Sequence, residues 1–527
     1  MRKAASRAPV LVIALDMGDG PLIRYWIAQG RLPHLAALAS AGAWYDLETT
    51  AAALHTSTWP TFATGTLPGR HGVYYPYQPT PGRQLARHIQ PDQYGVPTFW
   101  SLADAAGRRS VVYDVPETFP EAGFQGHAIF DWGTWAWYGE PATQPPSLKT
   151  TLGSAFGPYP LGFEAKRLGL NHPDHLDDRL RRSIEYKRET ATWLLREHPW
   201  DLAVIGFCET HPAGHYMWPK GADGPSDDPG FAPLLEVYAA IDRAVGALQA
   251  QVPSGTTLMV VSGDGVRANR CAWHLLPQVL ARLGYLVAAG AQDASARAPS
   301  AAPSALTALK RYVASRLPWR VRDRLGVWLQ TRSIDWSRTR AFTLPTDLEG
   351  CIRLNVKGRE PRGTVEAGAY VDLCREIATR MEELVNPETG QPAVKRVWLR
   401  HEVFPGARQE ELPDLMVTWS DEAPLNALYS PRLGRIDGVN PDDRPGTHSP
   451  AAFLLAAGPE TRPGRYHGRL VDVAPTVLTC LGMPPAPGLD GAALDELIRT
   501  SDAAGAAGSR EGDSEGAWTG ENAGVRR

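Results

Sequence analysis

The stretch LAVIGFCETHPAGHYMW, residues 202–218, decides the fold that we expect for this chain. Its first six residues are continuously apolar, which is typical of a strand that is buried on both faces of a parallel sheet. Glu209, His211 and His215 follow this run. Because ligands of open α/β sheets bind at the carboxyl ends of the strands, polar side chains directly after such a strand predict a functional site.

The two histidines stand four residues apart, and Pro212, Ala213 and Gly214 lie between them. If the turn between them is tight, both imidazoles can face one metal ion. The alternative is a pair of histidines on a surface loop. The pair alone does not decide between these interpretations, so the other strands are needed.

Two other apolar runs, residues 10–15 and 257–262, also lead into a carboxylate, which is Asp16 in the first case and Asp264 in the second. Asp16, directly after its strand, is either a metal ligand or the N-cap of a following helix. Since parallel strands end at the same edge of a sheet, we expect both carboxylates to lie close to the histidine pair.

Apolar residues at helical spacing separate these strands. They occupy residues 21–42, where Gly30 and Pro33 break the pattern, and also 176–197 and 232–250. Alternating strands and helices are typical of βαβ units. We therefore predict an α/β fold with parallel strands at its centre.

The composition excludes several classes of protein. With 527 residues the chain is long enough for one large α/β domain with insertions or for two domains. A formal net charge of -3 gives no overall attraction to nucleic acid or to an anionic membrane, so we expect neither as a partner. Five cysteines without a CxxC spacing indicate reduced thiols rather than a disulfide framework.

The amino-terminal segment has a basic start and a short apolar run, but this run ends in Asp16 rather than in a cleavage site. We interpret it as a strand and not as a secretory signal. No stretch approaches the roughly 20 apolar residues of a membrane-spanning helix. The expected location is therefore the cytoplasm.

The segment LHTSTWPTFATGTLPGRHGVYY, residues 54–75, places hydroxyl groups and an imidazole before a Trp-Pro pair and a short helix. Hydroxyls at the start of a helix serve either as caps or in attack on a phosphoryl group. Within this segment, TFATGTLPGRHGV resembles the string that follows the nucleophile in the alkaline phosphatase superfamily. The similarity is greatest to the bacterial type I phosphodiesterase/nucleotide pyrophosphatase branch.

Other stretches resemble the same family and occur in its order along the chain. They are residues 97–120, 335–363, 447–449 and 471–491. The resemblance implies a doubly wound, mostly parallel sheet that carries two divalent metals, often zinc, on either side of a threonine or serine nucleophile. Asp16 matches the family's first-strand ligand, His215 matches the histidine of its Asp-x-x-x-His motif, and His448 matches its carboxyl-terminal histidine.

Two positions depart from the family pattern. His211 replaces the aspartate of Asp-x-x-x-His, and Gly263-Asp264 replaces an Asp-His pair. One metal site then becomes a cluster of His211, His215 and His448, which zinc would accept. The other retains Asp16 and Asp264, which suit a harder ion or leave that site vacant. We expect one or two divalent ions, with zinc as the first choice.

The nucleophile of the bacterial relatives lies four residues before the tryptophan of the following helix, and His55 has that place before Trp59. A shift of one residue selects Thr56, and Ser57 and Thr58 remain further candidates. We predict that Thr56 attacks phosphorus and that His55 is a neighbouring base or ligand. The alternatives are a phosphohistidine at His55 and a plain helix cap over residues 55–58.

We expect a catalytic core over residues 8–265 and 335–497, with a basic helical insertion over 266–334 that forms a lid, and a disordered tail over 498–527. The insertion could also lie on an anionic membrane surface, but a solvated lid is our preferred interpretation. Four aromatic residues either line a substrate wall or pack a loop against the sheet, and packing is preferred: Trp132, Trp135, Trp137 and Tyr138.

The sequence therefore predicts a metal-dependent hydrolase of small phosphate esters, with diesters preferred over monoesters. One alternative is a related phospho- or sulfo-ester transferase or a sulfatase, and the lack of a cysteine at residues 55–58 counts against the sulfatase. The other is a pseudoenzyme that binds an anion without turnover, which the substitutions at 55 and 263 motivate.

Overall fold

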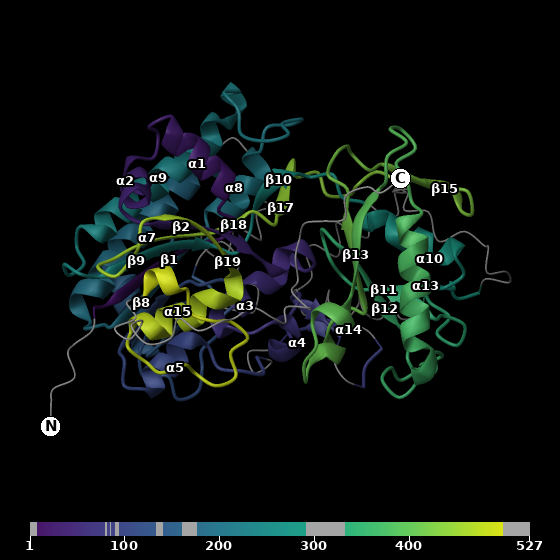
Figure 1. Ribbon diagram of the computed structural model, residues 1–527, viewed down its shortest axis with the longest axis horizontal. Helices are drawn as coiled ribbons and strands as arrows, with labels where there is room; N and C mark the ends of the chain where they lie inside the picture. Colours follow the sequence, from purple (N-terminus) through teal and green to yellow (C-terminus); the bar gives the residue numbers. More distant parts are fainter. Residues whose placement is uncertain are drawn as a thin grey trace, which may run out of the picture. The chain divides into compact units, whose positions relative to one another are not determined.

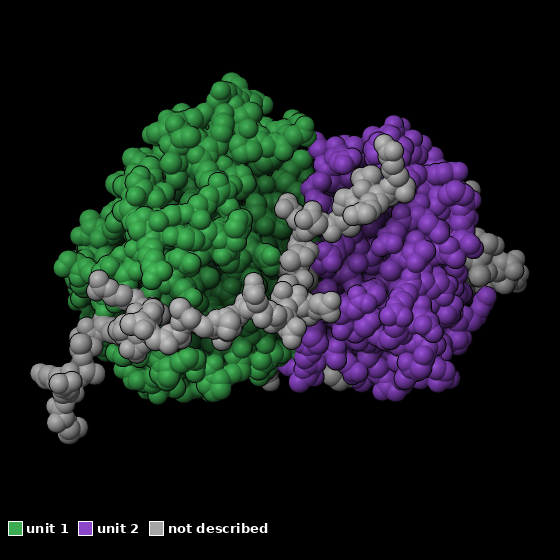
Figure 2. All heavy atoms as spheres, viewed as in Figure 1, with its two compact units in different colours: residues 1–71, 90–268, 444–527 green, residues 72–89, 269–443 purple. Residues whose placement is uncertain are grey.

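The computed structural model describes residues 8–79, 82–84, 86–89, 94–132, 141–160, 176–290 and 333–498. The chain forms two compact units, which are coloured separately in Figure 2. Unit 1 consists of residues 1–71, 90–268 and 444–527, and unit 2 of residues 72–89 and 269–443. Each unit has a hydrophobic core of its own and is described by itself below.

Unit 1 is built on a sheet whose described part has nine strands in the order β19-β2-β18-β9-β1-β8-β5-β6-β7. In chain order these strands are β1 (Val10–Leu15), β2 (Ala43–Glu48), β5 (Ser110–Tyr113), β6 (His127–Phe130), β7 (Ala142–Gln144), β8 (Leu202–Phe207), β9 (Thr257–Ser262), β18 (Ala452–Ala457) and β19 (Gly464–Arg469).

The centre of this sheet is parallel. Strands β9, β1, β8, β5 and β6 run in one direction, whereas β18 is antiparallel to both β9 and β2. Every residue of β1, β8 and β9 is buried, as their continuous apolar runs predict. The predicted doubly wound, mostly parallel sheet is confirmed.

Helices cover both faces of the sheet (Figure 1). One face, which carries Leu11, Ile13 and Leu15, packs against α1 (Gly20–Ala28), α2 (Pro33–Ala41), α6 (Ser147–Phe156), α7 (Leu176–Glu197) and α9 (Ala232–Gln249). The opposite face, with Val10, Val12 and Ala14, packs against α3 (Thr58–Thr64), α5 (Phe99–Ala105) and α15 (Val473–Cys480). Alternate residues of β1 therefore support different helical layers.

The predicted break in the first helical segment is present between α1 and α2. Asp19 caps α1, because its side chain accepts a hydrogen bond from the backbone N–H of Leu22. Gly30 has a φ of 69°, which ends the first helix, and Pro33 begins the second.

Gly206 in β8 provides a test of how closely the strands are packed. A methyl group at this position would lie 2.2 Å from the backbone carbonyl oxygen of Asp114. A backbone atom cannot move aside as the end of a flexible side chain can. We expect Gly206→Ala to lower the free energy of unfolding by about 1–3 kcal/mol, measured by urea denaturation. Gly224→Ala is the control, since a methyl group there meets no described atom within 4 Å. Equal midpoints for the two variants would contradict this packing.

Unit 2 contains a four-stranded antiparallel sheet in the order β11-β12-β14-β13. Its strands are β11 (Ala341–Thr343), β12 (Gly350–Leu354), β13 (Val394–Leu399) and β14 (Leu415–Trp419). The other elements of this unit include α10 (Leu276–Arg282), α13 (Tyr370–Glu382), α14 (Arg400–Val403), the hairpin of β15 (Ala427–Ser430) and β16 (Gly434–Asp437), and the pair β3 (Tyr77–Gln78) and β4 (Arg87–His88).

This unit differs from the helical insertion that the sequence predicts over residues 266–334. Residues 265–268 form strand β10, the following helix α10 is only seven residues long, and 291–332 lie outside the described residues. Residues 335–443, expected in the catalytic core, belong instead to unit 2. The division follows the packing of α10 and α13 on the antiparallel sheet, which joins segments before and after residue 335 in one core.

Other predictions concern single segments. Trp132 is buried in the core of unit 1, which agrees with the packing interpretation, whereas Trp135, Trp137 and Tyr138 lie outside the described residues. The predicted tail also lies outside them from residue 499 onward. Among the described helices, none combines the length and the apolar composition that crossing a bilayer requires.

Candidate active site

The carboxyl ends of four adjacent parallel strands in unit 1 carry acidic residues or imidazoles. Asp16 follows β1, Asp264 follows β9, and His211 follows β8. Strand β5, which pairs with β8, leads into the loop that contains Glu117. Parallel strands end at one edge of a sheet, so this edge collects side chains from segments that are far apart in the sequence.

Helix α8 (Thr210–Met217) carries the histidine pair. A tight turn between the histidines, which we considered as the way for both to face one ion, is not what the structure has: the segment is helical, and Pro212 lies in the first helical turn, where proline is tolerated. His211 and His215 are therefore one helical turn apart and face the same side. The third histidine, His448, lies on strand β17 (Gly446–Ser449), which pairs with β10 (Gly265–Ala268) beside α8 (Figure 1).

Within the described part of the chain, His211, His215 and His448 form the group that could hold a metal ion, with ligand atoms within 4.8 Å of one another. All three are buried. The Nε2 atoms of His211 and His215 are 3.0 Å apart, and Nη1 of Arg444 lies 3.1 Å from Nε2 of His215. Because a guanidinium only donates hydrogen bonds, Nε2 of His215 is unprotonated.

An oxygen engages the Nδ1 atom of each imidazole. Nδ1 of His215 donates to the carbonyl of Gly446 at 2.9 Å. Nδ1 of His211 lies 2.7 Å from Oδ2 of Asp16, and Nδ1 of His448 lies 2.6 Å from Oδ2 of Asp264. Such oxygens fix the orientation of a ligating imidazole and leave its Nε2 for the cation. The structure thus brings all five predicted metal ligands together, with both carboxylates against the rings.

Burial and mutual contacts shift the pKa values of several members of this group. Burial and the neighbouring charge of Asp16 raise the pKa of Asp264 to about 8. Burial also raises the pKa of Asp16, but His211 and the indole of Trp59 outweigh this effect, so the net direction is downward. Burial, His211 and Arg444 hold the pKa of His215 well below its usual value, which keeps this imidazole neutral.

The predicted nucleophile region forms a short 3₁₀ turn, His55–Ser57, that leads into α3. His55 is buried, and its ring centroid lies 4.4 Å from that of His448. Ser57 and Thr58 are also buried, and the hydroxyl of Ser57 donates to the carbonyl of Leu54 at 2.8 Å. Thr56 is the member of residues 55–58 that is partly exposed.

Two functional candidates escape the sequence analysis. The indole N–H of Trp59 donates to Oδ1 of Asp16 at 2.8 Å, so a residue that reads as core packing also holds a site carboxylate. Glu117 is 5% exposed, and its Oε2 is buried without a hydrogen-bond partner among the described residues. Glu117 lies within residues 97–120, which resemble the family, but this resemblance gives it no role; the order of the strands brings its loop to this edge.

A buried ion-pair network lies behind the histidine helix. Lys187 of α7 is fully buried, and its Nζ lies 2.6 Å from Oδ2 of Asp114, 3.4 Å from Oε1 of Glu209 and 3.0 Å from the carbonyl of Gly206. Tyr159 donates to the same oxygen of Glu209 at 2.9 Å. These contacts hold the turn from β8 into α8.

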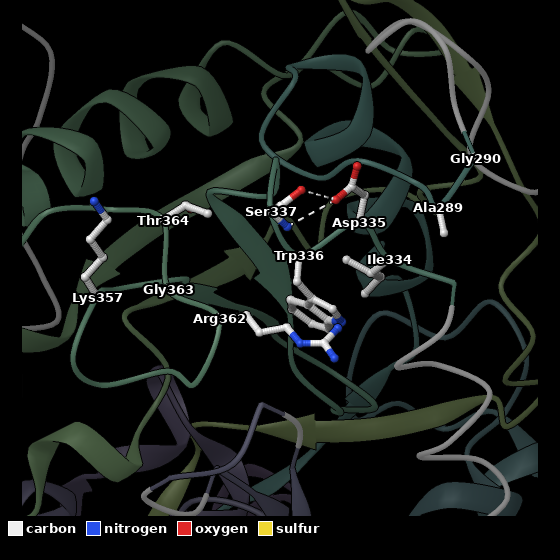
Figure 3. A pocket seen from close by; sticks show the side chains of 10 residues that line it. All are labelled: Ala289, Gly290, Ile334, Asp335, Trp336, Ser337, Lys357, Arg362, Gly363 and Thr364. Carbon is white, nitrogen blue, oxygen red and sulfur yellow. Dashed lines mark hydrogen bonds between the residues drawn. The ribbon is translucent and has the colours of Figure 1, made fainter.

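Unit 2 contains a separate open cavity of about 880 Å³ (Figure 3). Its lining includes Trp336, Lys357 and Arg362, and Asp335, whose carboxylate accepts hydrogen bonds from Ser337. The lining has no imidazole and none of the site residues predicted from the sequence. The site residues predicted from the sequence that the structure describes therefore lie outside this cavity.

The chain is similar to one protein family and to several solved structures. The family model described as type I phosphodiesterase/nucleotide pyrophosphatase matches residues 10–425. No curated protein matches the chain in sequence. Human ectonucleotide pyrophosphatase/phosphodiesterase 5 is structurally similar with a TM-score of 0.49 and 13% identity, over 93% of this chain and 100% of that chain. Phosphonoacetate hydrolase from Sinorhizobium meliloti 1021, in complex with phosphonoacetate, has a TM-score of 0.49 and 16% identity, over 90% and 96% of the two chains.

Proposed function

Because the chain belongs to the type I phosphodiesterase/nucleotide pyrophosphatase family, whose members are phosphoester hydrolases, we propose that it is a metal-dependent phosphodiesterase with a hydroxyl nucleophile and small-molecule substrates. The observation that carries this proposal is the convergence of three buried imidazoles whose ligand atoms lie within 4.8 Å of one another.

The residues present fit a divalent cation. Three imidazoles are a donor set that zinc accepts, and burial, with the nearby charge of Asp16 as the next cause, raises the pKa of Asp264 to about 8. A cation bound there supplies Lewis-acid stabilisation of the charge that develops on a phosphate oxygen. Asp16 and Asp264 orient His211 and His448 through their Nδ1 atoms.

The remaining roles fall to the chain's own side chains. Thr56, partly exposed at the start of α3, attacks phosphorus, and the ester oxygen of the leaving alcohol takes up a proton. His55, whose ring packs against that of His448, precedes Thr56 in the chain and is the base that we assign to this hydroxyl. Water then cleaves the phosphothreonine and restores Thr56, so that one phosphodiester and one water give a phosphomonoester and an alcohol.

Removal of the metal provides the direct test. Purified protein is expected to contain zinc and to hydrolyse bis(p-nitrophenyl) phosphate, to lose this activity on treatment with a chelator, and to regain it when Zn²⁺ is added. His215→Ala should lower the zinc content, whereas His34→Ala, at an exposed histidine of the same unit, should not. Protein without metal or turnover would instead support a binding module.

A further inference from the structure

Arg444 is a basic residue of the candidate site that the proposed roles leave unused. It lies two residues before β17, and its Nη1 is 3.1 Å from Nε2 of His215. Arg444 is partly exposed, whereas His215 is fully buried. A charged side chain therefore reaches from the protein surface to a buried nitrogen atom that the proposed metal site needs.

We propose that Arg444 binds a phosphate oxygen of the substrate, and that it becomes available for this role when a divalent cation takes Nε2 of His215. The guanidinium and the cation are then alternative partners of one nitrogen atom. This inference rests on the proposed function, because it requires a cation and a phosphate ester at the histidine cluster. Neither the family resemblance nor the sequence pattern assigns a role to Arg444.

The competition follows from the hydrogen bonds of His215. Its Nδ1 donates to the carbonyl of Gly446 at 2.9 Å, so Nε2 is the nitrogen that carries the lone pair. Nη1 of Arg444 donates to this lone pair. A cation coordinates an imidazole through the same lone pair, so it cannot bind His215 while the guanidinium is in place. Repulsion between the two positive charges adds to this competition.

The backbone fixes the point from which this side chain starts. Gly446, two residues further along the chain, lies so close to α8 that a Cβ atom there would be 2.0 Å from the carbonyl oxygen of Gly214. The ladder that pairs Gly446 with Ala268 of β10 holds the same segment. Pro445 restricts the backbone of Arg444 to extended conformations. The backbone therefore stays beside α8, and only the long side chain has to move when a cation binds.

The chemistry of a guanidinium makes phosphate the expected new partner. A guanidinium keeps its charge at physiological pH and binds two phosphate oxygens with two parallel N–H groups. Asp16 and Asp264 do not compete for it, because each already contacts an imidazole, at 2.7 and 2.6 Å. A phosphate oxygen on a cation held by His215 is therefore a close partner for Arg444.

Arg267 of β10 shows how a second guanidinium near the cluster is used differently. Its Nε donates to the backbone carbonyl of His448 at 3.1 Å, so it supports the strand that carries this histidine. Arg444 instead contacts an imidazole nitrogen that has to be given up to a cation. The two arginines therefore have different expected roles.

Zinc affinity tests the competition and does not depend on turnover. We expect Arg444→Met, which removes the charge but keeps an unbranched side chain, to bind Zn²⁺ about 10- to 100-fold more tightly than the wild type. Competition with a chromogenic chelator of known affinity measures the dissociation constants. The matched control is Arg196→Met, which removes the same group from an exposed position on α7, where it pairs with Glu197.

Inorganic phosphate tests the second role. Isothermal titration calorimetry of zinc-loaded protein should show that phosphate binds about 10- to 100-fold more weakly to Arg444→Met than to the wild type or Arg196→Met. The KM for bis(p-nitrophenyl) phosphate should rise in Arg444→Met, with a smaller change in kcat. Arg444→Lys keeps the charge but loses the paired N–H groups, so its phosphate affinity should lie between those of Arg444→Met and the wild type. This variant also serves as the test if Arg444→Met does not fold.

Tighter zinc binding together with weaker phosphate binding in Arg444→Met would support the inference. Zinc affinity equal to or below that of the wild type would overturn it, because the guanidinium would then not compete with the cation. Unchanged phosphate affinity would overturn it as well. The proposed function stands in these cases if the wild type binds zinc and hydrolyses the diester, whereas wild-type protein without zinc and without turnover would overturn both.

Discussion

Thr56→Ala lowers the kcat for a phosphodiester substrate by about 10³- to 10⁶-fold, the loss typical of an enzyme that is deprived of its nucleophile. We assign the attack to Thr56 because it is partly exposed and can meet a substrate, whereas the other hydroxyl residues of this segment, Ser57 and Thr58, are buried. Steady-state kinetics with bis(p-nitrophenyl) phosphate measure the effect. The zinc content and the melting temperature should remain close to those of the wild type.

Two variants make this result specific. Thr56→Ser keeps a hydroxyl at the same position and should retain activity within about tenfold, which corresponds to 1.4 kcal/mol in the barrier. Thr58→Val removes a buried hydroxyl but preserves its shape, and it should leave most of the activity. Activity that survives Thr56→Ala and disappears in Thr58→Val would assign the attack to Thr58 instead.

Lys187→Met lowers the free energy of unfolding by about 3–5 kcal/mol, since removing one partner of a buried ion pair leaves the other charge uncompensated. In this chain two buried carboxylates lose their cation. Asp114 lies 2.6 Å and Glu209 3.4 Å from Nζ of Lys187. Burial lowers the pKa of Lys187, but these acids outweigh it and raise the pKa well above the usual value. Urea denaturation monitored by circular dichroism measures the change.

The matched control is Arg182→Met, which removes a cation from an exposed position of the same helix, where it pairs with Asp178. Exposed pairs contribute about 0–1 kcal/mol, so the midpoint should hardly move. Adding Asp114→Asn to Lys187→Met should recover part of the loss, because it neutralises one of the two stranded acids. A Lys187→Met protein as stable as Arg182→Met would contradict the network.

The central strands of unit 1 are predictable from the sequence because burial on both faces requires an apolar residue at every position. The runs at residues 10–15, 202–207 and 257–262 become β1, β8 and β9 with the same limits. Helix α7 also has its predicted limits, residues 176–197, since its amphipathic pattern is long and regular. These elements place Asp16, His211 and Asp264 at one edge.

Unit 2 shows where such patterns fail. Its strands β11 and β12 are short, and β12 pairs with β14, which comes much later in the chain. Short strands with distant partners have no periodicity long enough to be distinguished from loops. The helical lid is predicted from the basic residues beyond 290. That segment lies outside the described residues.

The sequence selects most residues of the candidate site, but it does not predict the contacts between their side chains. Motif positions select His215 and His448, yet they do not show that Asp16 and Asp264 lie against imidazole rings. Trp59 reads as a core residue, and its indole contact with Asp16 depends on where α3 meets β1. Glu117 has no signal of its own, because its place depends on β5 being the neighbour of β8.

The position of β18 between β9 and β2 has a consequence for how the protein is made. A ribosome completes residues 269–443, and with them all of unit 2, before it reaches Ala452–Ala457. Until then β9 lacks one of its two neighbours and β2 lacks both, because β19 follows β18 in the chain, and their unpaired edges remain open to other chains. The sheet of unit 1 therefore stays incomplete until β18 is synthesised, near the end of translation.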